Sequence, residues 1–121
     1  MEQIAEFRIP YKVTGNEGLN KLYAGGHWAI RKKKADKWHN LVHQCLVEQL
    51  PKRIFDVPVI IDISYDSRLD IDNHGYLSKL IVDGMKGYLI HEDSRKYVQG
   101  LIQRFHDEGE QIIIRVMEVE E

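Results

Sequence analysis

Two aspartates separated by one residue are the feature of this sequence whose residue types and spacing could carry chemistry. Asp70 and Asp72 stand in the stretch RLDIDN, which runs from residue 68 to residue 73. If the chain stays extended through Asp72, both side chains project from one face, because side chains in a strand repeat every two residues. Adjacent carboxylates repel each other unless a cation lies between them, and such hard oxygen ligands suit magnesium. The pattern therefore indicates a magnesium site.

The aspartates have two competing interpretations. Asp72 or Asn73 would also serve as the N-cap of a helix, a position that both residue types favour. An EF-hand calcium loop would place Asp70, Asp72 and Gly75 at its first, third and sixth positions. That loop requires a bidentate Glu at its twelfth position, where this chain has Ile81. The calcium interpretation therefore fails at a necessary ligand, whereas capping stays an alternative.

The hydropathy pattern predicts the elements that must position these residues. Runs of strand character, most of them alternating apolar and polar side chains, lie over residues 4–13, 57–66, 97–106 and 111–119. Helical spacing predicts one helix over 29–50, which Pro51 ends, and another over 77–85. The four-residue link 107–110 predicts a hairpin. The order β-α-β-α-β-β predicts an α+β fold, a single domain over residues 1–121 with its helices packed on a small mixed sheet.

Length and composition restrict the class of protein. The 121 residues are enough to bury one core. Cys45 is the only cysteine, so an internal disulfide and a Cys-rich zinc site are excluded, and a reducing cytoplasmic setting is favoured. No apolar run approaches the roughly 20 residues that span a bilayer, and the N-terminus lacks a signal-peptide pattern. We therefore expect a cytoplasmic protein with no membrane partner.

Charge is unevenly distributed along the chain. The net charge of −2 argues mildly against nucleic-acid binding. However, residues 21–54 carry eight Lys and Arg against two acidic residues. Lys32, Lys33 and Lys34 fall in the first turns of the predicted helix, where cations oppose the helix dipole. This placement favours contact with a DNA backbone, although any soluble protein with two unlike faces can show the same asymmetry.

Further motifs follow the two aspartates in a fixed order. Lys79 precedes Asp83 by four residues, and an apolar segment then ends on the acidic pair Glu92 and Asp93. With these motifs the sequence resembles the RusA family of Holliday-junction resolvases. Asn20 also fits the loop that precedes the first helix in that family, as does Tyr23. The residues that carry the resemblance most specifically are Arg68, Asp70, Asp72, Asn73, Lys79, Asp83, Glu92 and Asp93.

The resemblance implies a structure-selective endodeoxyribonuclease that binds four-way DNA junctions as a homodimer. It would make paired nicks with magnesium in recombination or repair. By position, the resemblance implies that Asp70, Asp72 and Asp93 are the catalytic, metal-binding acids and that Lys79 is the essential basic residue. The residues that we expect to contact DNA are Arg68, Lys79, Lys32, Lys33 and Lys34.

Two departures from the family pattern bear on these expectations. Residues 74–76 look like an insertion, which moves Lys79 one helical turn further from the acids, and Leu69 stands where some members carry arginine. The alternative function is a catalytically silent protein that binds branched DNA, and a further one is a protein-interaction module. His74 and His91 would be either a base or surface histidines. We expect Asp83 to pair with Lys79.

Overall fold

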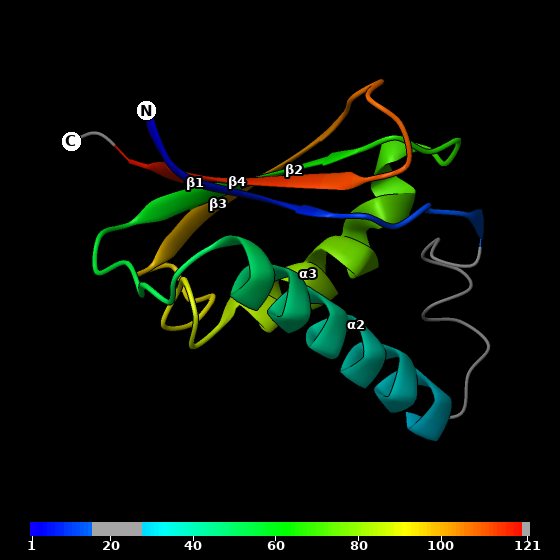
Figure 1. The fold of residues 1–121 in the computed structure, drawn as a ribbon, viewed down its shortest axis with the longest axis horizontal. Helices are drawn as coiled ribbons and strands as arrows, with labels where there is room; N and C mark the ends of the chain where they lie inside the picture. The colour runs from blue at the N-terminus through cyan, green and yellow to red at the C-terminus, as the bar shows by residue number, and fades with distance from the viewer. Residues whose placement is uncertain (16–27, 120–121) are drawn as a thin grey trace.

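A four-stranded sheet carries the fold, and both long helices pack on one of its faces (Figure 1). The computed structural model describes residues 1–15 and 28–119, so Asn20 and Tyr23 lie outside the described residues. The elements in chain order are β1 (Glu2–Ile9), α2 (Trp28–Gln49), β2 (Val59–Tyr65), the 3₁₀ helix η2 (Ile71–His74), α3 (Gly75–Met85), β3 (Val98–Phe105) and β4 (Ile112–Glu118). The predicted order of strands and helices, and the α+β class, are confirmed.

The strands lie in the order β1-β4-β2-β3, with β2 parallel to β3 and the other neighbours antiparallel. The sheet is therefore mixed, as predicted, but the prediction of a hairpin between the last two strands was wrong. β3 and β4 flank β2 on opposite sides, and residues 106–111 cross the end of β2 between them. The apolar content of the strands explains this order. β2 is buried along nearly its whole length and needs a neighbour on each side, whereas the more polar β3 occupies an edge.

The core lies between the sheet and the helices. Ile61 and Ile63 of β2 are completely buried, as are Leu77 and Ile81 of α3. These residues belong to one continuous apolar cluster that also includes Trp38, Val42, Cys45 and Leu46 of α2. Packing of α3 into this cluster holds the start of the helix at a fixed position relative to the end of β2. The packing therefore determines the path of the acid-bearing segment, residues 66–73, which joins the two elements.

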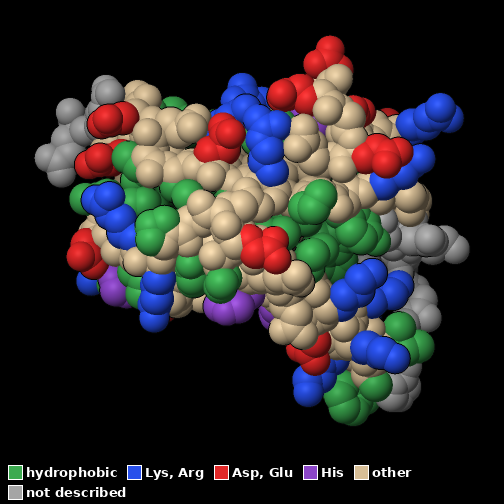
Figure 2. Space-filling model, in the orientation of Figure 1, with side chains coloured by type: hydrophobic (Ala, Val, Ile, Leu, Met, Phe, Trp, Pro, Cys, Tyr) green, Lys and Arg blue, Asp and Glu red, His purple; other side chains and the backbone are tan. Residues whose placement is uncertain are grey.

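Helix α2 projects beyond the sheet at its N-terminal end (Figure 1). All of its buried residues lie from Trp38 onward. Lys32, Lys33 and Lys37 in the first half are exposed, and Lys and Arg side chains gather on this end of the molecule in Figure 2. Within the described residues no helix, α2 included, is long and apolar enough to cross a membrane. The projecting end of α2 is thus a basic surface that the core does not use.

A close approach of the two helices gives a test of this packing. A Cβ added at Gly84 of α3 would lie 2.8 Å from the Cβ of Val42, and neither atom can move without its backbone. Gly84→Ala should therefore lower the free energy of unfolding by about 1–3 kcal/mol. At Gly75 an added Cβ meets nothing within 4 Å and the backbone is already helical. Gly75→Ala should be neutral or stabilising by up to about 1 kcal/mol. Urea unfolding measures both, and equal effects would contradict the close helix contact.

Candidate functional site

The two aspartates lie in the segment that joins β2 to α3. β2 ends at Tyr65 and Asp72 lies in η2, so the chain does not stay extended through Asp72, which was the condition for placing both aspartates on one face. The chain turns instead. Asp70 is extended, with φ −63° and ψ 153°, and Asp72 lies in the first turn of η2. The amide of Asn73 donates to the carbonyl oxygen of Asp70 at 3.0 Å, which closes this turn.

Helix capping does not account for these carboxylates. Asp70 is the N-cap residue of η2, but its side chain makes no capping hydrogen bond. The N-cap of α3 is His74, so neither Asp72 nor Asn73 has the capping role that the sequence allowed. Both aspartates are exposed. Within the part of the chain that the structure describes, neither carboxylate has a hydrogen bond or an ion pair.

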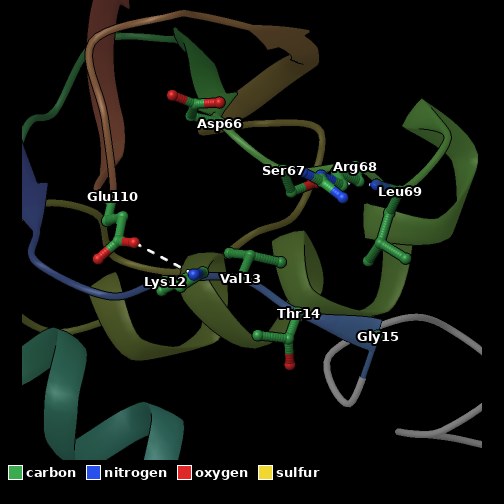
Figure 3. Close-up of a pocket in the computed structure, with 9 residues that line it drawn as sticks. All are labelled: Lys12, Val13, Thr14, Gly15, Asp66, Ser67, Arg68, Leu69 and Glu110. Carbon is green, nitrogen blue, oxygen red and sulfur yellow. Dashed lines mark hydrogen bonds and ion pairs between the residues drawn. The ribbon is translucent and has the colours of Figure 1, made fainter.

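Arg68 lies two residues before Asp70 and lines a cavity of about 600 Å³ (Figure 3). Ser67 and Arg68 form one wall, and the Lys12–Glu110 ion pair, with its charged atoms 3.3 Å apart, forms the opposite wall. Arg68 is exposed, and among the described residues its guanidinium has no hydrogen-bonded or ionic partner. A guanidinium in this state can bind a phosphate through two parallel hydrogen bonds.

A chain of alternating charges occupies the C-terminal half of α3 and the loop after it. Lys79 Nζ lies 2.9 Å from Asp83 Oδ2, which confirms the predicted ion pair. Lys86 Nζ lies 3.0 Å from Asp83 Oδ1 and 3.2 Å from Asp93 Oδ1, so it joins the two acids. Burial alone would raise the pKa of Asp83, but the two lysines outweigh burial and lower it. The same contacts with Asp83 raise the pKa of Lys79 and that of Lys86, so both stay protonated.

The structure brings Lys79 and Asp93 together but does not join them to the other acids. Lys79 and Asp93 line one cavity of about 300 Å³ beside the first half of β3. Residues 1–15 and 28–119 contain no group of three His, Cys, Asp or Glu side chains placed to hold a metal ion. Asp70 and Asp72 present the oxygen donors that magnesium prefers, whereas Asp93 is engaged by Lys86. The three predicted ligands therefore do not fit one metal site in this arrangement.

The surroundings of the two histidines and of Glu92 agree only in part with the sequence predictions. His91 is exposed and lies 2.8 Å from Asp56, so the surface interpretation holds for it. The same interpretation was wrong for His74, which is completely buried. Glu92 accepts a hydrogen bond from the Ser94 hydroxyl at 2.9 Å, within its own loop. Sequence reasoning missed the contact of Lys86 with Asp93, because six residues outside any helix or strand separate them.

A comparison with known protein families and with curated proteins finds no match to this chain. The resemblance over residues 68–94 therefore stays a prediction, and the roles of its residues are argued below from their placement.

The ion pair between Lys86 and Asp93 gives a test of whether Asp93 is a metal ligand. If Asp93 binds a divalent cation, it must leave Lys86, so Lys86→Met should raise the affinity for Mn²⁺ about two- to fivefold. This range corresponds to the free energy of about 0.2–1 kcal/mol that an exposed ion pair contributes. Lys96→Met removes a nearby cation that packs on Tyr97 instead and should have a smaller effect. Titration calorimetry measures both, and equal affinities in the two variants would argue against Asp93 as a ligand.

Proposed function

We propose that this protein is a magnesium-dependent endonuclease that nicks four-way DNA junctions, acting as a homodimer in the cytoplasm during recombination or repair. One observation carries the proposal: Arg68, Asp70 and Asp72 are exposed within five residues and have no partners among the described residues. Charged groups that neither cap a helix nor form ion pairs contribute little to folding. A divalent cation and a phosphate would give these three neighbouring groups the partners that they lack.

The chemistry of these groups matches a phosphodiester and its counterion. Arg68 would hold a phosphate by paired hydrogen bonds, and Asp70 and Asp72 would supply oxygen donors to magnesium. Lys79 would act as a cation and not as a base, because its contact with Asp83 raises its pKa and keeps it protonated at neutral pH. These roles follow the order of motifs in the resemblance.

The projecting end of α2 supports DNA as the substrate. Lys32 and Lys33 are exposed there, and residues 28–38 carry five Lys or Arg against one acidic residue, Asp36. Phosphate contacts supply most of the sequence-independent affinity for DNA. A two-fold dimer would place one such surface and one acid-bearing segment on each of two symmetric strands of a junction.

Variants that replace an aspartate by asparagine test whether these acids are needed for cleavage and not for DNA binding. Asp70→Asn and Asp72→Asn should each lower magnesium-dependent nicking of a labelled four-way junction at least about 100-fold. Asp93→Asn tests the third acid of the resemblance, and an equal loss in this variant would show that Asp93 acts with the other two during cleavage. Junction affinity should be unchanged or higher, because less negative charge faces the phosphates. Gel assays of cleavage and of binding in calcium give the two quantities.

The matched control is Asp107→Asn, an exposed acid outside the segment that has no partner among the described residues. Asp62 is unsuitable, because it is 1% exposed and binds the guanidinium of Arg104 with both oxygens. Binding without cleavage by the unsubstituted protein would favour a silent branched-DNA-binding protein. Neither binding nor cleavage would favour a protein-interaction module.

The basic end of α2 predicts a defined salt dependence. The slope of log affinity against log salt reports how many phosphates the protein neutralises. Lys32→Ala/Lys33→Ala should make this slope shallower by about one to two. Lys52→Ala/Arg53→Ala removes the same charge just beyond the opposite end of α2 and should leave the slope unchanged. Fluorescence anisotropy across a salt series measures the slopes, and the reverse pattern would place the DNA surface at the other end of the helix.

A further inference from the structure

His74 is an ionisable side chain that the proposed chemistry does not use, yet it is completely buried directly beneath the acid-bearing segment. Its ring stacks on Tyr65, the last residue of β2, with centroids 4.2 Å apart and an interplanar angle of 27°. Phe105, the last residue of β3, meets the same ring edge-on at 5.7 Å. The imidazole is therefore fixed by the ends of two neighbouring strands.

The hydrogen bonds of His74 determine which of its nitrogens carries the proton. Nδ1 lies 3.3 Å from the carbonyl oxygen of Ile71, and a carbonyl can only accept, so Nδ1 bears the hydrogen. Nε2 is then an acceptor for the Ser67 hydroxyl, 2.7 Å away. Burial lowers the pKa of His74, although the carbonyls of Ile71 and Asp70 and the charge of Asp72 oppose this. The neutral ring satisfies both contacts.

The contacts of His74 hold the segment that carries the exposed charged residues. Ser67 Oγ bonds the imidazole and also accepts the amide of Leu69 at 3.3 Å. The carbonyl of Ile71 bonds the other nitrogen. The ring thus bonds positions 67 and 71 directly and holds position 69 through Ser67, whereas the side chains of Arg68, Asp70 and Asp72 are exposed.

We propose that His74 is a positioning residue that, through Ser67 and the carbonyl of Ile71, fixes the segment that presents Arg68, Asp70 and Asp72. The proposal rests on the proposed function for its catalytic consequence.

Two variants test the anchor. His74→Phe keeps an aromatic ring against Tyr65 but removes both nitrogens, and Ser67→Ala removes the hydroxyl that bonds Nε2. In each, the amide of Asn73, which donates to Asp70, should exchange with solvent about five- to tenfold faster, the equivalent of one lost hydrogen bond. The double variant should show little further increase, because both changes break the same connection.

Tyr65→Phe is the matched control. It keeps the ring that stacks on His74 and removes only the hydroxyl, which lies 2.6 Å from Ser78 Oγ on the side of α3. This variant should leave exchange at Asn73 unchanged. If Ser67→Ala raises that exchange no more than Tyr65→Phe does, the anchoring role is refuted. This comparison holds even if His74→Phe does not fold.

Junction cleavage gives the second readout. In Ser67→Ala the kcat should fall about five- to tenfold, with the junction Kd unchanged and with a higher magnesium concentration needed for half-maximal rate. Tyr65→Phe should retain the magnesium dependence of the unsubstituted protein. Absence of cleavage in the unsubstituted protein would reject the proposed function, whereas exchange at Asn73 would still decide the role of His74. An unchanged kcat beside faster exchange would reject the catalytic consequence of the anchor.

Discussion

The stack of His74 on Tyr65 joins the end of the central strand to the start of α3, and the geometry of the candidate site depends on this contact. The Tyr65 hydroxyl continues the connection through Ser78 to Gln103, so β2, α3 and β3 are linked by buried polar groups at one end of the sheet. An unsatisfied polar group in this position would cost about 1–3 kcal/mol. Burial of Tyr65 also raises the pKa of its hydroxyl, so the phenol stays neutral and can donate to Ser78. The eight residues from 66 to 73 therefore run between two fixed ends.

The balance of charges distinguishes acids that stabilise the fold from charged residues that have no partner among the described residues. Asp62 is buried in the sheet and paired with Arg104, and Asp83 is mostly buried and paired with two lysines. Each of these acids has its cation within hydrogen-bonding distance, as buried charges require. Arg68, Asp70 and Asp72 have no such compensation among the described residues. The contrast within one small domain is the physical basis for placing function on the segment between β2 and α3.

The sequence predicted the elements well and their contacts less well, for identifiable reasons. Alternation and helical spacing are local signals, and they located α2 to within one residue at each end. Strand pairing is not local. A short link between β3 and β4 suggested a hairpin, but the apolar β2 takes the position between them. The burial of His74 was also missed, because its polar neighbours in sequence indicate a surface, whereas Tyr65 and Phe105, which cover it, are distant in the chain.

The two parts of the candidate site differ in how readily they can rearrange. Asp93 is half-exposed, and an ion pair of this kind is worth about 0.2–1 kcal/mol. A divalent cation or a phosphate can therefore exchange Lys86 away from Asp93 at little cost. The hydrogen bonds of His74 are partly buried and belong to a fully buried ring, so breaking one costs more than breaking an exposed ion pair. The segment with Asp70 and Asp72 is therefore the fixed part of the candidate site, and Asp93 is the acid whose contacts a ligand can change most readily.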